Sequence, residues 1–130
     1  MARAWKWFDK RALLLLHDES LAEHGGLPGL RDEGLLDSAL ARPLNLAAYG
    51  DPDVCELAAS YCVGLAKNHP FVDGNKRAAF LALGLFLYSN GLRLTASQAE
   101  ATLAVLAVAA GDWDEATLAA WLRERTAPRP

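Results

Sequence analysis

The sequence contains little cysteine, which excludes a fold held together by a framework of disulfides. Cys55 and Cys62 are the two cysteines, and both fall within one predicted helix. A separation of seven residues along a helix places their Cα atoms about 10 Å apart, beyond the reach of a disulfide. We therefore predict two buried free thiols, as suits a reducing cytosol. A reactive-cysteine site is disfavoured because no paired histidine motif accompanies either residue.

The chain also lacks a surplus of positive charge and a long apolar run. Its net charge is −3, whereas a general nucleic-acid binder usually carries a basic excess, so we expect no direct nucleic-acid binding. Any cationic site must then be local. The apolar run over residues 78–88 is too short to span a bilayer, and we expect no membrane partner. Trp5, Lys6 and Asp9 interrupt the apolar stretch that a signal peptide would need, so a cytoplasmic location is expected.

Linkers, internal repeats and low-complexity segments are absent from the sequence as well. A chain of 130 residues is long enough to bury a core without staples. Apolar residues make up 52% of the chain and charged residues 22%, which is a globular balance. Residues 1–130 are therefore predicted to form a single domain.

Helix caps, turn residues and apolar spacing predict an all-α fold. We expect six helices, over about residues 9–24, 32–42, 51–68, 75–90, 97–110 and 112–125. Pro43 is expected to end the second helix, which leaves residues 43–50 as a loop or small hairpin. Residues 128–130 are expected to be a frayed tail. The fourth predicted helix is apolar on nearly every face, so we place it at the centre of the bundle.

Residues 69–77, His-Pro-Phe-Val-Asp-Gly-Asn-Lys-Arg, combine groups that a phosphate site needs. They lead into the fourth predicted helix, whose first N–H groups lack intrahelical partners and carry the positive end of the dipole. Gly74 allows close approach of an anion to the backbone, and Lys76 and Arg77 reinforce the positive field. Each cation alone would suit a solvated first turn. Two in succession oppose the helix dipole, however, and this favours a bound anion.

Three side chains upstream add to this pattern. Asp73 is placed to hold Mg²⁺, which binds through one or two carboxylates plus phosphate oxygens, although Asp is also a preferred helix N-cap. His69 is suited to take a proton near neutral pH, although a lone histidine is more often structural. Phe71 is expected to anchor the loop against the core.

The same nine residues resemble the motif of the Fic/Doc family, His-x-Phe-x-Asp/Glu-Gly/Ala-Asn-Gly/Lys-Arg. Residues 16–18, 25–29 and 31–40, and Asn90-Gly91, are similar to death-on-curing (Doc) type toxins of that family. The resemblance covers about residues 9–125. It implies a compact six-helix Fic/Doc-type bundle around a buried central helix, in a bacterial protein encoded beside an antitoxin.

The resemblance implies a role for each residue of the motif. His69 would be the general base that deprotonates a hydroxyl of the target protein, and Asp73 would coordinate Mg²⁺ bound to ATP. The ATP phosphates would be bound by Gly74, Asn75, Lys76 and Arg77. Residues 43–50 would form the family's flap, which aligns the target by strand-like contacts. Lys67 is a weaker candidate for a contact with the nucleotide or the target.

Two positions bear on which part of ATP is transferred. Family members that transfer AMP carry glycine where Lys76 stands and a second arginine where Phe80 stands. The pattern seen here is that of Doc-type proteins, which phosphorylate elongation factor EF-Tu with the γ-phosphate and stop translation. Gly74 is nevertheless typical of the AMP-transferring members, so a Fic-type adenylyltransferase remains an alternative. A catalytically inactive helical binding module is a further one.

Regulation is expected to come from a partner, because the inhibitory signature Ser/Thr-x-x-x-Glu-Gly/Asn is not found in the sequence. The expected partner is a Phd-like antitoxin that places a C-terminal helix in a groove, for which Trp113 and Trp121 are candidates. His17 is interpreted as a structural residue under the motif loop. A metal cluster of His17, His24 and His69 is disfavoured, because no closely spaced pair of ligands supports it.

Overall fold

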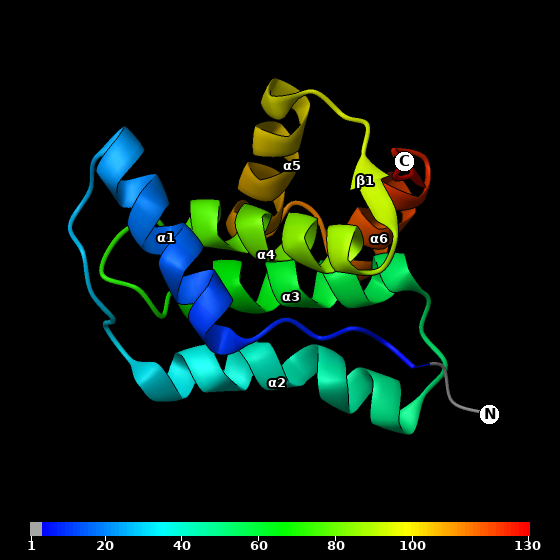
Figure 1. Cartoon of the computed structure of the whole chain (residues 1–130), viewed down its shortest axis with the longest axis horizontal. Coiled ribbons are helices and arrows are strands. Elements are labelled where there is room, and N and C mark those ends of the chain that lie inside the picture. The colour runs from blue at the N-terminus through cyan, green and yellow to red at the C-terminus, as the bar shows by residue number, and fades with distance from the viewer. Residues whose placement is uncertain (1–3) are drawn as a thin grey trace.

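A computed structural model describes residues 4–130, and in this part of the chain the all-α prediction is confirmed (Figure 1). The helices are α1 (Lys10–His24), α2 (Glu33–Tyr49), α3 (Val54–Asn68), α4 (Asn75–Ser89), α5 (Gln98–Ala110) and α6 (Glu115–Arg123). Strands β1 (Leu92–Leu94) and β2 (Thr126–Pro128) form one small antiparallel sheet. None of the helices in residues 4–130 has the length and apolar character needed to cross a membrane.

Side-chain caps begin most of these helices, and α4 is the exception. The capping oxygens that accept from first-turn N–H groups belong to Asp9, Asp32, Asp53, Ser97 and Asp114. The N-cap of α4 is Gly74, which offers no side-chain oxygen. Because the first N–H groups of a helix have no intrahelical partner, the start of α4 keeps donors that a bound anion could use.

The helix at the centre of the bundle is α3, so the placement of the fourth helix there was wrong. Residues 57–66 of α3 are all buried, and α3 packs against α2, α4, α5 and α6. α4 runs antiparallel beside α3 (Figure 1) and buries one face, while Leu81 and Leu85 on its other faces are only partly covered. Small residues of α3, such as Ala58, Ser60 and Gly64, allow the neighbouring helices to approach it from several sides. The average apolarity of the segment does not reveal this.

The predicted loop or flap at residues 43–50 is also wrong, because α2 continues through Pro43 to Tyr49. A proline inside a helix removes one hydrogen bond and costs about 3 kcal/mol. Leu36, Ala39 and Pro43 lie on one face of α2 and are all buried. Burial of a leucine-sized side chain contributes about 1.5–3 kcal/mol, so the packing of this face offsets the loss at Pro43.

The frayed tail predicted at residues 128–130 is wrong in part, because Pro128 is the last residue of strand β2. Leu92 pairs with Pro128, and Leu94 pairs with Thr126, in an antiparallel register. The N–H of Arg129 donates to the carbonyl of Gly91 at 3.0 Å. These contacts fix the end of the chain beside the end of α4.

The cysteines behave as predicted. Cys55 and Cys62 are both free and buried in α3. Burial raises the pKa of the Cys62 thiol to about 12, and burial is also the main reason that the pKa of the Cys55 thiol is raised. Because the thiolate is the nucleophilic form, neither residue is suited to covalent catalysis.

We expect Gly64→Ala to lower the free energy of unfolding by about 1 kcal/mol. A Cβ at Gly64 would stand 3.3 Å from the backbone of Ala39, where α2 and α3 are packed tightly together. The control is Gly84→Ala in α4, where a Cβ would meet nothing within 4 Å. That change should raise the free energy of unfolding by about 1 kcal/mol through helix propensity. Urea denaturation measures both, and equal stabilisation would contradict a rigid α2–α3 contact.

Candidate active site

His69 ends α3 in a backbone conformation that side chains rarely adopt. Its φ of 49° and ψ of 54° are left-handed, and within residues 4–130 it is the one non-glycine residue with positive φ. This conformation turns the chain sharply out of α3 and leaves the residue exposed. Unusual backbone conformations of this kind cost about 1–3 kcal/mol and concentrate at functional sites. The geometry therefore agrees with His69 as a candidate catalytic residue.

Arg31 holds this turn in place from the segment between α1 and α2. Its Nε donates to the carbonyl of His69 at 2.7 Å, and its Nη2 donates to the carbonyl of Asn68 at 2.9 Å. The backbone N–H of Arg31 donates to the carbonyl of Pro70 at 2.8 Å. The Asn68 amide in turn donates to the carbonyl of Leu35 at 2.9 Å. Four carbonyls near the end of α3 and the start of α2 are thus bonded, and the position of His69 is set by Arg31.

Phe71 and Asn75 fix the shape of the loop from inside. Phe71 is buried and stacks on the ring of His17, with 3.8 Å between ring centroids and 17° between ring planes. The Asn75 side chain accepts from the Phe71 N–H at 2.9 Å and donates to its carbonyl at 3.0 Å. Phe71, predicted to anchor the loop, is thus packed against the ring of His17. The Asn75 amide spans the loop, so any contact of this residue with phosphate would use its backbone N–H.

His17 supports the loop from α1, as the sequence predicted. It is buried, and its Nε2 lies 2.8 Å from the carbonyl oxygen of Asp73. Because a carbonyl can only accept a hydrogen bond, Nε2 carries the proton and donates. Among the described residues, no group of three or more His, Cys, Asp or Glu side chains could hold a metal ion. The disfavoured cluster of His17, His24 and His69 is therefore absent there.

Asp73 lies immediately before Gly74, its carboxylate is exposed, and its side chain does not cap α4. One oxygen accepts from the N–H of Gly74 at 2.9 Å, and the other accepts from the N–H of Leu27 at 3.2 Å. The residue is exposed, and each oxygen keeps further lone pairs. An exposed carboxylate beside an uncapped helix start fits Mg²⁺ carried by a phosphate ligand, because Mg²⁺ needs few protein ligands.

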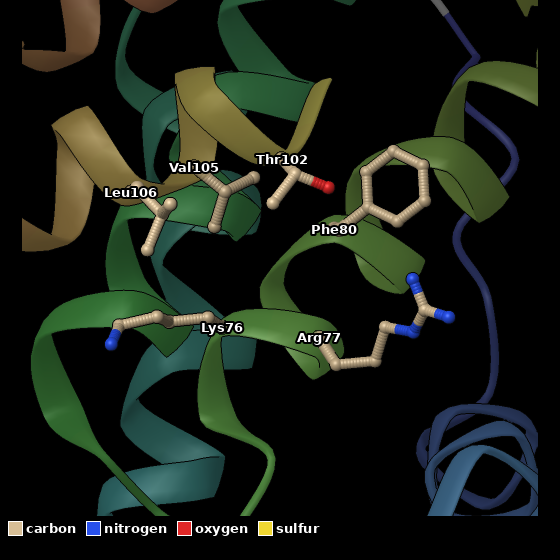
Figure 2. Close-up of a pocket in the computed structure, with 6 residues that line it drawn as sticks. All are labelled: Lys76, Arg77, Phe80, Thr102, Val105 and Leu106. Carbon is tan, nitrogen blue, oxygen red and sulfur yellow. The ribbon is translucent and has the colours of Figure 1, made fainter. Parts of the chain in front are cut away.

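Glycine is favoured at position 74 by the backbone at the entry to α4. Its φ is +75°, and a Cβ there would lie 3.1 Å from Nε2 of His17. Lys76 is exposed, whereas Arg77 is half-buried and turned toward α1. Nε of Arg77 donates to the Ser20 hydroxyl at 3.3 Å, and its Nη2 donates to Nε2 of His24. Figure 2 shows the Lys76 and Arg77 side chains pointing in opposite directions from the first turn of α4.

The motif residues surround one pocket of about 280 Å³. Its lining includes six of the predicted site residues, namely His69, Asp73, Gly74, Asn75, Lys76 and Arg77. Lys67 is not part of this lining. Its ammonium lies instead beside the end of α5, 3.5 Å from where a Cβ on Gly111 would stand.

A second pocket of about 170 Å³ lies between α4 and α5 (Figure 2). Lys76 and Arg77 form one end of it, and Phe80 and Thr102 form another part of its wall. Phe80, which stands where AMP-transferring members of the family would carry a second arginine, therefore places an aromatic ring next to the cations of the motif. Trp113 and Trp121 line neither of these two pockets and pack on each other, with ring centroids 6.0 Å apart.

The sequence predicted the motif loop and the supporting His17, but it did not reveal several other residues that position the loop. Arg31, Ser20 and the contact of His24 with Arg77 come from segments far away in sequence. Arg31 precedes Asp32, the N-cap of α2. No local sequence pattern distinguishes an arginine that positions a loop from one that is only solvated.

Comparison with known proteins places these features in context. The sequence pattern of the Fic/DOC family matches residues 7–87. The chain is 38% identical over 112 residues to "Protein kinase doc" of Escherichia phage P1, covering 85% of this chain and 88% of that protein. It is 47% identical over 75 residues to "Toxin Doc" of Mycolicibacterium smegmatis, covering 55% of this chain and 57% of that protein. The second match thus spans little more than half of the relative's length.

Proposed function

Because this chain belongs to the Fic/DOC family, we propose that it is the toxin of a toxin–antitoxin pair and acts as a protein Ser/Thr kinase. The proposed reaction transfers the γ-phosphate of ATP to a hydroxyl of a translation elongation factor, EF-Tu, and arrests translation in the bacterial cytoplasm. The observation that carries the proposal is the complete motif, with a base and a carboxylate at one pocket beside an uncapped helix start.

The residues of the loop divide the chemistry between them. His69 would take the proton of the acceptor hydroxyl as the new bond from that oxygen to Pγ forms. The bond from Pγ to the β,γ-bridging oxygen breaks, and ADP leaves with that oxygen. The N–H groups at the start of α4 and the Lys76 and Arg77 cations would stabilise the charge on the phosphate oxygens. Asp73 would hold Mg²⁺, which neutralises phosphate charge when bound.

Transfer of the γ-phosphate is favoured over transfer of AMP by positions 76 and 80. Lys76 takes the place of a glycine, and its side chain occupies space next to the pocket that Arg77 and Phe80 also line. Gly74 motivated the alternative of a Fic-type adenylyltransferase. The left-handed backbone of Gly74 and its close approach to His17 explain this glycine without reference to the nucleotide.

The relatives' names support a regulated toxin. We propose that a cognate, Phd-like antitoxin binds this chain through a C-terminal helix lying in a groove. Trp113 and Trp121 remain candidates for that groove. They are half-buried at the edge of the core, so their outer faces could still contact a partner.

We expect purified protein with Mg-ATP to label EF-Tu from the γ-phosphate. Incubations with [γ-³²P]ATP and [α-³²P]ATP run in parallel make the measurement, and a reaction without Mg²⁺ is the control. Label that enters EF-Tu only from the α-phosphate would contradict the kinase and establish the adenylyltransferase. Absence of label from either position would contradict both activities toward this acceptor.

We expect the contacts of Arg77 with α1 to lower the KM for Mg-ATP. Ser20 and His24 hold its guanidinium, so Ser20→Ala with His24→Phe should raise the KM for Mg-ATP several-fold through loss of about 1 kcal/mol in positioning. Glu19→Ala on the same helix, an exposed change, is the control. An unchanged KM would show that α1 does not position Arg77 for nucleotide binding.

A further inference from the structure

A groove runs from the motif loop along the second half of α5. Its volume is about 550 Å³, within the range of about 300–1,000 Å³ of ligand-binding clefts. His69 and Lys76 line the end next to the loop, and Leu103, Leu106 and Asp112 line the remainder. The groove therefore shares His69 and Lys76 with the motif pocket, but the rest of its lining comes from α5 and Asp112 rather than from the loop.

The α5 wall of the groove is apolar and open to solvent. Leu103 is 67% exposed and Leu106 is 43% exposed. They lie one turn apart, and alanines at positions 107 and 110 leave space between α5 and the loop. Single exposed leucines are common on protein surfaces, but two on the wall of a cleft next to a candidate base indicate a binding surface.

The donor and the acceptor of the transferred group must meet at His69 from different directions. In an in-line transfer, the attacking oxygen approaches the phosphorus from the side opposite the leaving oxygen. The motif pocket, with Lys76 and Arg77, is suited to the donor phosphates. The acceptor hydroxyl must reach His69 by a route that these phosphates leave open, and the groove is such a route.

The region predicted to align the target does not have the expected structure. Residues 43–49 are helical in α2, so they offer no exposed strand edge for the target to pair with. Another surface must then hold the target segment. The α5 groove adjoins His69 directly, whereas α2 is not part of its lining.

We propose that the α5 groove binds the segment of the target protein that carries the modified hydroxyl. A large apolar side chain next to that hydroxyl packs against Leu103 and Leu106, and this places the hydroxyl at His69. This inference rests on the proposed kinase function and adds to it the surface that selects the acceptor.

The test uses Leu103→Ser, because Leu103 lines the groove but not the pocket of Figure 2. Because Leu103 is exposed, the change should leave the fold intact. The matched control is Leu15→Ser on α1, where the leucine is 63% exposed. With [γ-³²P]ATP in excess, the KM for EF-Tu should rise about tenfold in Leu103→Ser. The affinity for Mg-ATP, measured by calorimetry, should stay that of the wild type, and Leu15→Ser should change neither value.

The possible contrary outcomes are distinct. An unchanged KM for EF-Tu in an active Leu103→Ser variant would overturn the groove proposal alone. A parallel loss of Mg-ATP affinity would overturn it in favour of a nucleotide site. An unchanged KM together with loss of neutralisation by the antitoxin would overturn it in favour of an antitoxin site. Wild-type protein that binds Mg-ATP but leaves EF-Tu unlabelled would overturn the proposed function and this inference together.

Discussion

Replacement of His69 by alanine is expected to lower the rate of phosphoryl transfer about 10²–10⁴-fold, the usual contribution of a general base. The residue lines both the motif pocket and the α5 groove, so its ring is where a donor phosphate and an acceptor hydroxyl would meet. Arg31 holds the backbone carbonyl of His69, and within residues 4–130 the His69 side chain has no hydrogen bond or ion pair whose loss would disturb the loop. Mg-ATP affinity should therefore persist. Single-turnover labelling from [γ-³²P]ATP measures the rate, and calorimetry measures the affinity.

Because the backbone of His69 is left-handed, the alanine variant needs a control for backbone strain. Alanine at a φ of 49° has no side chain that can bond locally, whereas asparagine tolerates this conformation better. His69→Asn should be as inactive as His69→Ala but at least as stable in thermal unfolding. Activity that returns with asparagine would assign the loss in alanine to the backbone rather than to a missing base. Growth arrest by His69→Ala equal to that of the wild type would favour a catalytically inactive binding module.

Local chemistry explains which parts of the fold could be predicted. Asp9 and Ser97 begin helices where the sequence indicated, because a capping oxygen and the amides it bonds lie within three residues of each other. The same short range made the motif loop predictable. Gly74 and Asn75 act on their immediate neighbours, and Phe71 stands in the middle of the loop that it anchors.

The errors arose where distant contacts decide the structure. The proline at position 43 predicts the end of a helix, but α2 continues through it because Pro43 is buried together with Leu36 and Ala39 on one face. Strand β2 forms because residues 126–128 meet residues 92–94, which belong to another part of the chain. The central position of α3 depends on the helices around it rather than on its own apolarity. None of these outcomes is encoded in a short window of sequence.

Arg31 is the clearest case of a site residue that only the fold reveals, and Arg31→Met is expected to lower the transfer rate about 10–100-fold. Its guanidinium bonds the carbonyls of Asn68 and His69, and methionine cannot make either hydrogen bond. Hydrogen bonds to charged groups contribute about 1.5–3 kcal/mol each, less at an exposed site such as this. The His69 turn would relax, and displacement of a catalytic group by about 1 Å can cost about 10²-fold in rate.

A purely structural role for Arg31 predicts a different result from a positioning role. If Arg31 positions His69, kcat falls while the KM for Mg-ATP changes little, because the start of α4 is held separately by Phe71 and Asn75. Arg31→Lys, which supplies one charged donor group in place of the planar guanidinium, should recover part of kcat. Arg11→Met is the control, since Arg11 bonds only the nearby Asp9 among the described residues. Equal losses of kcat and thermal stability in Arg31→Met and Arg31→Lys would mean that the arginine holds the fold and not the base.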